Sequence, residues 1–475
     1  MLFSSVVFLF YFLPVILFLY YICFWSRTVQ NMLLLAASLL FYAWGEPKNI
    51  LLLLASIMFN YMAGMLLEYF KDRKKAKKAV LVIVLVVNLG ILFIFKYFNF
   101  VMQNINSVLG EEHKIQVAKI LLPIGISFFT FQAMSYVIDV YRGETKVQKN
   151  PFSLGLYIAF FPQLVAGPIV RYTSVAEQII GRKGTWQKFS AGSCRFVVGL
   201  SKKVLLSNQF AAVTDRIFTM QMQGGVPALL AWLGAISYAF QIYYDFSGYS
   251  DMAIGLGLMF GFKFEENFNY PYTATSISDF WRRWHISLGS WFKSYVYFPL
   301  GGSRLKNTDK VARNLLIVWM LTGIWHGAEW TFFLWGFFNF LLIAWEKFAK
   351  FEKWTIKPWI KHVYTLFFLL LFWVIFRADN VMQAGSYLSD LFLFGGHGFF
   401  SSHAVMFVKE NLIYFLVGIL FSMPVARRVN KRLFNRAKGT MLLEMIYPFA
   451  ISGLFFICIC YLLKGTYNPF IYFNF

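Results

Sequence analysis

The chain has 475 residues, of which 59% are hydrophobic and only 14% are charged, whereas a soluble domain carries roughly 25% charged residues. The charges are unbalanced, because 44 Lys and Arg stand against 22 Asp and Glu, which gives a net charge of +22. This composition excludes a disordered chain, a collagen, a coiled coil and, with 4 cysteines, a small disulfide scaffold. Nucleic-acid binding is disfavoured, because the basic residues lie between long apolar runs. The composition is typical of a polytopic membrane protein with basic loops.

The first apolar run, 2–25, has no positive n-region and no small-residue cleavage site, so we predict a retained helix and not a signal peptide. A helix that crosses a bilayer needs ~20 mostly apolar residues. Further apolar runs cover about 31–45, 50–70, 79–100, 120–140, 152–166, 191–210, 226–245, 314–345, 361–377, 385–395, 411–424 and 440–463. The sequence therefore predicts an all-α membrane protein with about eleven spanning helices. With no internal repeat and no linker, we expect a single integral-membrane domain over 1–475.

Proline and glycine interrupt the chain in two stretches. Pro162 and Pro168 lie in the first, 152–170, and Pro299 lies in the second, 271–303. Such breaks are tolerated at membrane depth only where protein or a water-filled cavity covers the freed backbone groups. We therefore expect re-entrant or half-length helices in both stretches.

Two dense basic blocks predict the orientation of the chain. Their members are Lys71, Arg73, Lys74, Lys75, Lys77 and Lys78 in the first block, and Arg427, Arg428, Lys431, Arg432, Arg436 and Lys438 in the second. The positive-inside rule places both blocks in the cytoplasm. Counting helices from each block then puts Met1 and the C-terminal tail, 464–475, on the extracytoplasmic side. Topology setting accounts for both blocks without a specific lipid site.

One histidine stands out against the apolar background. His326 lies in the middle of an apolar run between Gly323 and Gly327, and Thr322 lies four residues before it on the same helix face. Ionisable groups at such depth are costly and often functional. A neutral imidazole there suits a general base. A packed histidine bonded to a backbone carbonyl is an equal alternative on spacing alone.

A short basic helix is predicted near a second histidine. Ser276-x-x-Asp279 has the pattern of a capping box, so a helix begins there. Asp279 then reaches Arg282 and Arg283 at i+3 and i+4. The two arginines are candidates for binding the phosphates of a cytosolic cofactor.

The second histidine, His285, follows this basic pair. Spacing predicts that Trp281 and His285 stack one turn apart on the same helix. A helix of this composition also suits a membrane interface with no catalytic role. His285 and His326 have no evident third metal ligand, and no zinc, nucleotide-binding or nucleophile-elbow motif is present, so we predict no metal site.

Four long segments carry a family resemblance. They are FFPQLVAGPIVRY, YYDFSGYSDMAIGLGLMFGF, NFNYPYTATSISDFWRRWHISLGSWFKSYVYFPLGGSR and TGIWHGAEWTFFLWG. They resemble the membrane-bound O-acyltransferase superfamily, in particular its bacterial alginate O-acetyltransferase-like branch. The resemblance implies a ring of tilted helices around a thin centre, where a cytosolic tunnel and an outer funnel meet near a histidine. It also implies a location in the bacterial cytoplasmic membrane.

The resemblance further implies an activity and its residues. An acetyl group would pass from a cytosolic thioester, acetyl-CoA, towards an extracytoplasmic polysaccharide hydroxyl. By motif match, His326 corresponds to the family's active-site histidine and His285 to its second histidine. The phosphates of acetyl-CoA would meet basic side chains, for which the candidates are Lys202, Lys203, Arg282 and Arg283. The resemblance also implies a separate extracytoplasmic partner of the SGNH hydrolase-like type that completes transfer.

The C-terminal tail, 464–475, is rich in aromatic residues. An interfacial aromatic belt would explain that composition. Twelve extended residues also span up to ~40 Å, which is enough to fold back into an outer funnel. The tail resembles the short aromatic motif with one tyrosine of bacterial extracytoplasmic acylation systems, and this favours Tyr472 as an acyl carrier.

Two other functions stay open on the sequence. A transporter or flippase for a polysaccharide precursor would explain interrupted helices and buried polar groups, but not the FWRRWH and GIWHG segments. Within the superfamily, the acyl group could be D-alanyl, taken from a carrier protein and destined for teichoic acid.

Overall fold

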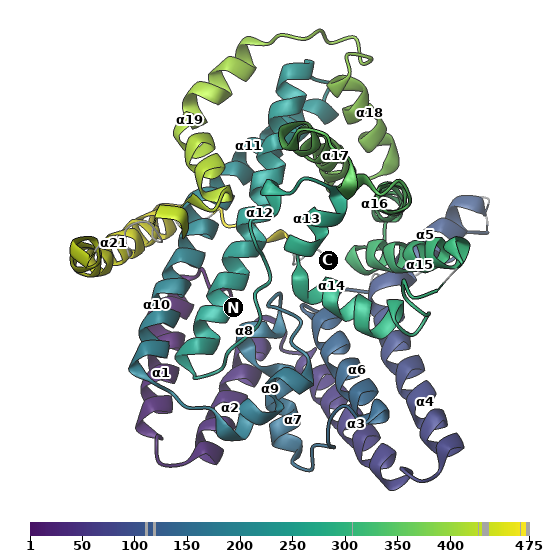
Figure 1. The fold of residues 1–475 in the computed structure, drawn as a ribbon, viewed down its shortest axis with the longest axis vertical. Coiled ribbons are helices and arrows are strands. Elements are labelled where there is room, and N and C mark those ends of the chain that lie inside the picture. Colours follow the sequence, from purple (N-terminus) through teal and green to yellow (C-terminus); the bar gives the residue numbers. More distant parts are fainter. Residues whose placement is uncertain are drawn as a thin grey trace. The chain divides into compact units, whose positions relative to one another are not determined.

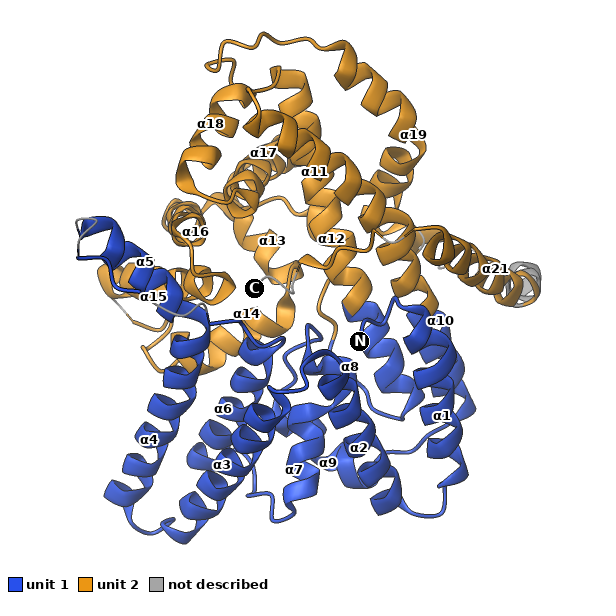
Figure 2. Cartoon of the chain, turned by 180° about the vertical axis from the view of Figure 1, so that it is seen from behind, with its two compact units in different colours: residues 1–196, 250–265 blue, residues 197–249, 266–475 orange. Residues whose placement is uncertain are grey.

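The computed structural model describes the backbone over most of the chain, and all side chains there except those of 437–444. The described residues are 1–109, 113–116, 120–305, 307–425, 427–429, 437–465 and 467–471. Within these ranges every regular element is a helix, which confirms the all-α class. The chain forms two compact units (Figure 2): unit 1 is Met1–Phe196 with Ser250–Glu265, and unit 2 is Val197–Tyr249 with Glu266–Phe475. The single domain over 1–475 stays a prediction.

Unit 1 is an assembly of helices from the first part of the chain (Figure 1). They are η1 (Phe8–Phe12), α1 (Leu13–Ile22), α2 (Arg27–Gly45), α3 (Ile50–Tyr69), α4 (Lys74–Leu92), η2 (Phe93–Tyr97), α5 (Phe98–Val108), α6 (Ile126–Arg142), α7 (Pro151–Ala159), α8 (Phe161–Leu164), α9 (Tyr172–Gly181) and the start of α10 (Trp186–Ser201). Local chemistry sets their ends. The Ser26 hydroxyl accepts a hydrogen bond from the Val29 N–H where α2 begins, and Gly143 ends α6 with φ +75°.

Two buried asparagines inside the apolar helices of unit 1 are paired with each other. The Asn88 amide donates to the Asn60 carbonyl oxygen at 3.1 Å, and the Asn60 amide donates back at 3.2 Å, which joins α4 to α3. Burying an amide costs free energy unless its hydrogen bonds are made. These reciprocal bonds therefore allow two asparagines to sit in helices that are otherwise apolar.

Unit 2 contains the helices that position the candidate site. They are the end of α10, η4 (Lys202–Ser207), α11 (Asn208–Met222), most of α12 (Ala228–Met259), η5 (Pro271–Thr273), α13 (Ile277–Arg283), α14 (Ile286–Phe292), η6 (Lys293–Tyr297), α15 (Thr308–His326), α16 (Trp330–Phe348), η7 (Phe351–Lys353), α17 (Pro358–Arg377), α18 (Val381–Leu391), α19 (Ser402–Ser422) and α21 (Ala437–Lys464). Within this unit α13 packs against α14, α16 and α17, and α16 packs against α15 and α17.

Six helical segments in the described ranges are long and apolar enough to cross a membrane. They are Arg27–Gly45, Ile50–Tyr69, Lys74–Val108, Pro358–Arg377, Ser402–Ser422 and Met445–Lys464. Length and composition of this kind suit a multi-pass membrane protein. The larger count of about eleven spanning helices stays a prediction.

Both interrupted stretches contain short helices, as predicted. In the first, α7 ends at Ala159 and α8 is a single turn before a loop. A Cβ on Gly167 would lie 2.4 Å from the Cα of Gln163, so only glycine fits this tight turn. In the second stretch the chain forms η5, α13, α14 and η6, none longer than seven residues.

The basic blocks lie at or near helix ends. The first block occupies the exposed turn between α3 and α4 and the first turn of α4. Half of the second block, Lys431, Arg432 and Arg436, lies outside the described residues. Basic residues at helix ends are compatible with topology setting, which stays a prediction.

Candidate functional site

His285 lies in the sharp turn between α13 and α14. Its backbone is left-handed, with φ +44°, and its side chain is buried at 1% exposure. A left-handed conformation is unfavourable for a residue with a Cβ and persists only where the surroundings enforce it. The turn thus directs the imidazole into the interior of unit 2 at a cost in backbone strain, which is a common property of functional sites.

The amide of Asn267 determines which nitrogen of His285 carries the proton. Asn267 Oδ1 accepts hydrogen bonds from the Ser287 N–H at 3.2 Å and the Ser287 hydroxyl at 2.9 Å. Because a backbone N–H can only donate, this amide atom must be the oxygen. His285 Nδ1 lies 3.2 Å from the same oxygen, so Nδ1 is the donor and bears the proton. The lone pair of the neutral ring is therefore on Nε2.

His326 is the last residue of α15 and is held by close packing of two helices. A Cβ on Gly323 would lie 2.4 Å from the Phe332 carbonyl, and one on Gly336 would lie 2.6 Å from the Trp319 carbonyl. Only glycines at these points let α15 and α16 approach so closely. The approach fixes the C-terminal end of α15, and with it the imidazole of His326.

The Gly327 N–H, which follows His326, is a candidate donor to an oxyanion by position alone. In the structure it donates to the Gly323 carbonyl at 3.4 Å, in the last turn of α15. A long hydrogen bond at a helix end is weaker than one of ordinary length. The structure thus gives this N–H a partner inside the helix.

The structure brings the two histidines together around Trp325. The indole of Trp325 lies 6.0 Å from the His285 ring and 5.0 Å from the His326 ring, centroid to centroid. Phe246 packs edge-on against His285 at 4.5 Å. Both imidazoles are nearly sealed, since His326 is only 3% exposed. Histidines 41 positions apart in sequence thus share one aromatic neighbourhood.

Aromatic rings enclose this pair. His326 lies 5.1 Å from Trp335 and 5.3 Å from Phe376, while Trp281 packs against Trp319 and Trp335. A low-dielectric enclosure strengthens electrostatic interactions and excludes water from a reacting centre. Neutral imidazoles in such a place are suited to accept a proton from a hydroxyl.

One sequence prediction about this helix is wrong. Trp281 and His285 do not stack one turn apart, because α13 ends at Arg283 and the left-handed turn re-directs His285. The indole N–H of Trp281 instead donates to the side-chain amide oxygen of Asn339 at 2.8 Å. Helix periodicity cannot be extended across a chain reversal, and nothing in the local pattern marks residue 285 as left-handed.

The capping and charge pairs of α13 are confirmed. The Ser276 hydroxyl accepts from the Asp279 N–H at 2.9 Å. Asp279 lies 3.5 Å from Arg282 and 3.1 Å from Arg283, and Arg282 also pairs with Glu352 at 2.6 Å. The side chain of Arg282 is 59% exposed, so this guanidinium lies at the surface of unit 2.

The two candidate lysines for the donor phosphates differ in burial. Lys202 is half-buried at the start of η4. Lys203 is buried and pairs with Asp245 at 2.6 Å. This ammonium is thus paired inside unit 2, and its assignment to the donor phosphates stays a prediction. Arg282, Arg283 and Lys202 stay predictions.

The C-terminal tail is described as far as Ile471, and Tyr472 lies outside the described residues. Within unit 2 the tail turns back after α21 and packs on α12. Phe470 is 7% exposed and its ring lies 5.0 Å from that of Tyr249. The Ile471 N–H donates to Asp245 at 2.8 Å. The described part of the tail is thus folded against the protein.

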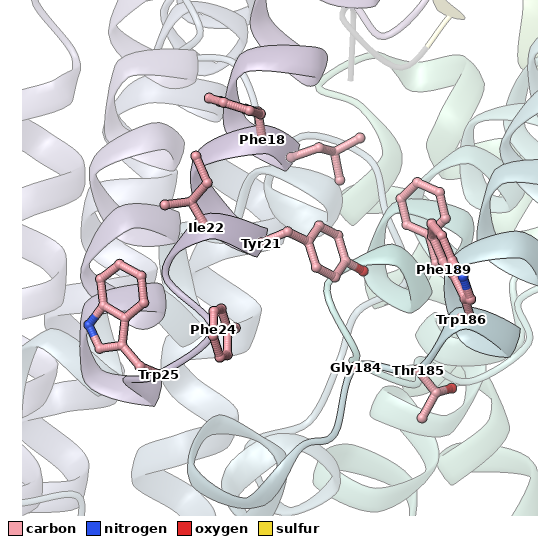
Figure 3. Close-up of a pocket in the computed structure, with 10 residues that line it drawn as sticks. Phe18, Tyr21, Ile22, Phe24, Trp25, Gly184, Thr185, Trp186 and Phe189 are labelled. Atoms are coloured by element: carbon pink, nitrogen blue, oxygen red, sulfur yellow. The ribbon is translucent and has the colours of Figure 1, made fainter.

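A separate apolar pocket is present in unit 1, between α1 and the start of α10. Its volume is about 880 Å³ and it is lined by aromatic and aliphatic side chains (Figure 3): Leu17, Phe18, Tyr21, Ile22, Phe24, Trp25, Gly184, Thr185, Trp186 and Phe189. None of these side chains is a histidine or a carboxylate. This lining suits an apolar occupant.

Sequence reasoning missed two residues of this region, Asn267 and Asp245. Asn267 stands in a polar segment, EENFNYP, where nothing distinguishes it from Asn269. Asp245 lies in an apolar helix. Carboxylates are rare in such helices and need a partner there, so its presence was a usable signal. The described residues contain no group of three or more His, Cys, Asp or Glu that could hold a metal ion.

Burial affects the protonation of His285, which lies outside the six candidate spanning segments. It lowers the pKa of the imidazole from its usual 6.5 to about 3, because an imidazolium would be desolvated. The ring is therefore neutral at pH 7, with Nε2 as its basic atom.

This pKa predicts a pH-dependent stability. The unfolded chain binds a proton at His285 near pH 6.5, whereas the folded chain does not until near pH 3. The contribution of the neutral, buried His285 to the stability of the fold is therefore complete above pH 6.5 and is lost as the pH falls. When the pH falls from about 7.5 to about 5, the parent is expected to lose about 2 kcal/mol more of its free energy of unfolding than His285→Gln loses. Tryptophan-monitored unfolding of the solubilised protein measures this difference.

His403, exposed at the start of α19, provides the control for this test. His403→Gln is expected to keep the pH dependence of the parent. Identical pH dependence in His285→Gln and the parent would contradict a neutral, buried His285.

Comparison with known proteins reveals one family. The profile of the membrane-bound O-acyltransferase family matches residues 76–382. The chain is 43% identical over 400 residues to the probable alginate O-acetylase of Azotobacter vinelandii, covering 83% of this chain and 79% of that protein. It is 36% identical over 421 residues to the peptidoglycan O-acetyltransferase of Helicobacter pylori, covering 81% and 78%. It is 30% identical over 246 residues to the teichoic acid D-alanyltransferase of Bacillus subtilis, covering 49% and 60%.

Proposed function

Because the chain belongs to the membrane-bound O-acyltransferase family and is a multi-pass membrane acyltransferase, we propose that it moves an acetyl group from cytosolic acetyl-CoA to the hydroxyls of an extracytoplasmic polysaccharide. His326 is the general base, and His285 assists it from the same aromatic enclosure. The observation that carries this proposal is the burial of both imidazoles around Trp325. A thioester is already activated, so the protein has mainly to deprotonate and orient a hydroxyl.

The first hydroxyl to react is the phenol of Tyr472. As the phenol oxygen bonds to the acyl carbon, His326 takes the phenol proton and the thioester C–S bond breaks. The departing thiolate then recovers the proton from the imidazolium. A phenol has a pKa of ~10 and leaves more readily than a sugar alcohol, so an acetyl-tyrosine keeps much of the activation of the thioester. The packing of residues 467–471 on unit 2 supports this role.

The acceptor lies outside the cytoplasmic membrane. The positive-inside rule, applied to the two basic blocks, gives both termini an extracytoplasmic position, so the tail and its acetyl group are on the acceptor side. A separate extracytoplasmic SGNH-type protein then completes the transfer to the polymer. Alginate and peptidoglycan are the acceptor polymers named for two of the relatives, and either class offers hydroxyl groups to this chemistry.

D-Alanyl transfer is the second candidate within the family. The relatives named for O-acetylation match about four fifths of this chain at 36–43% identity, whereas the B. subtilis D-alanyltransferase matches 49% of it. This difference in coverage favours acetyl. A transporter function receives no support from the relatives named above.

Isotope-labelled acetyl-CoA tests the donor, the carrier and the partner in one assay. Inside-out membrane vesicles containing the protein are expected to transfer label to the protein itself when no acceptor is added. Transfer to a polysaccharide is expected only when an extracytoplasmic extract is sealed within the vesicles. D-Alanine activated on its carrier protein serves as the control donor and is expected to give no label. Labelling from the carrier protein and none from acetyl-CoA would contradict the proposal.

A further inference from the structure

A buried ion pair lies where the tail meets α12. Lys203 Nζ and Asp245 Oδ1 are 2.6 Å apart, and the two side chains are 3% and 1% exposed. A Cβ on Gly248 would lie 2.8 Å from the Gly199 carbonyl, so a glycine allows α12 to approach the segment that carries Lys203. Burying two charges is expensive, and pairing alone often fails to recover the cost. An ion pair in such a place therefore calls for a use beyond stability.

Both partners of the pair also bind the main chain of the tail. The Lys203 ammonium donates to the Pro469 carbonyl. The Asp245 carboxylate accepts from the Ile471 N–H at 2.8 Å. The residue between them, Phe470, is buried, with its ring 5.8 Å from Lys203 Nζ. One charged pair thus satisfies a carbonyl and an N–H two residues apart, which is recognition of main-chain groups by charge-assisted hydrogen bonds.

Further polar contacts hold the residues just before this point. The Asn208 amide donates to the Asn468 side-chain oxygen at 3.3 Å. The Tyr467 hydroxyl donates to Asp215, which pairs with Arg377 at 2.9 Å. The segment 467–471 is therefore held at successive positions by groups from η4, α11 and α12 of unit 2.

One member of the pair is adjacent in sequence to a residue of α12 that touches a site histidine. Asp245 directly precedes Phe246, whose ring packs on His285 at 4.5 Å. Tyr472 directly follows Ile471, one Cα–Cα step of about 3.8 Å beyond the bond to Asp245. Holding the backbone of 469–471 therefore restricts where Tyr472 begins.

We propose that Lys203 and Asp245 form a main-chain clamp, which seats residues 469–471 in unit 2 and positions Tyr472 for acyl transfer. They are positioning residues, since they act through the tail. The clamp binds main-chain groups, and the side-chain contacts of Tyr467, Asn468 and Phe470 set the register of the tail. This inference rests on the proposed carrier role of Tyr472, but seating of the tail is measurable without any acyl transfer.

The test removes both charges together. A single change leaves an uncompensated buried charge and is often strongly destabilising. The double variant Lys203→Met with Asp245→Leu replaces the pair by apolar groups of similar size, so the chain is expected to fold. Digestion of the purified full-length protein by carboxypeptidase Y, followed by intact mass, reports seating. In the parent, residues 467–471 are expected to resist removal; in the double variant they are expected to be removed at least about tenfold faster.

Acetylation of the product in cells is the second readout. Misplacement of a reacting group by about 1 Å can cost ~10²-fold in rate, so a loss of that order is expected in the double variant at normal protein abundance. Arg195→Gln with Asp251→Asn, which removes a partly buried pair of unit 1, is the matched control and is expected to leave the digestion end point unchanged.

The outcomes separate the clamp from the carrier. An unchanged digestion end point in the double variant, or a released tail with normal acetylation, would overturn the clamp. If Tyr472→Phe keeps full acetylation while its tail stays seated, the carrier role fails and the positioning role fails with it. Release of the tail in the double variant would still establish Lys203 and Asp245 as its binding site.

Discussion

Replacing His326 with alanine is expected to lower O-acetylation of the product by about 10²–10⁴-fold, the usual contribution of a general base. The proposed reaction requires removal of a hydroxyl proton inside the aromatic enclosure of His326. The His326 imidazole is sealed there at 3% exposure between Trp335 and Phe376. Alanine offers no proton acceptor, and the enclosure admits no substitute. Acetate released by mild base from purified polymer measures the effect.

The controls for His326 separate chemistry from folding and from transport. His403→Ala, at an exposed position of α19, is expected to retain full acetylation. His326→Gln also removes the imidazole, so it is expected to be as inactive as His326→Ala. Because it keeps the size of the side chain, the protein is expected to remain at normal abundance. Polymer export is expected to persist in both His326 variants. Loss of export with acetate retained would instead identify a transporter.

Replacing Tyr472 with phenylalanine is expected to abolish acetylation of the product while leaving the protein folded. The change removes one oxygen atom, the proposed acyl acceptor, and keeps the aromatic ring that the tail presents. Without the phenol no acetyl-tyrosine forms, and the acetyl group has no bound acceptor at the site. Trapping with labelled acetyl-CoA, followed by mass spectrometry of the C-terminal peptide, is expected to detect acetyl on the parent and none on the variant.

Tyr467 provides a matched control in the same tail. Tyr467→Phe also removes a phenol oxygen, but that oxygen bonds to Asp215. The expected result is a loss of one hydrogen bond, worth about 1 kcal/mol, with acetyl-tyrosine still formed. Unchanged product acetylation in Tyr472→Phe would reject the carrier role and leave the aromatic belt as the explanation of the tail.

The candidate site shows where local pattern suffices and where it fails. The capping of α13 by Ser276 was predictable, since capping depends on residues three apart. The position of His285 was not, because its left-handed backbone, two residues after the end of α13, breaks the helical periodicity. Asn267 precedes His285 by 18 positions, and the bond that sets its tautomer exists only once the chain has folded.

The charges show the same division. Scarcity of charge in the sequence was enough to identify a membrane protein and to make His285 and His326 visible. It also made Lys203 a candidate for donor phosphates, which stays a prediction. A lysine in a sequence carries no information on its partner, and the buried carboxylate of Asp245 is 42 positions away.

The sequence by itself determined the all-α class, the short helices in the interrupted stretches and, through long family motifs, the acyltransferase activity. Each of these depends on composition or on residues close together in the chain. Tertiary structure alone decided that two distant histidines share Trp325, that Asn267 leaves the basic lone pair on His285 Nε2, and that Lys203 and Asp245 hold the tail. These depend on contacts across tens to hundreds of residues, and such contacts exist only after the helices pack.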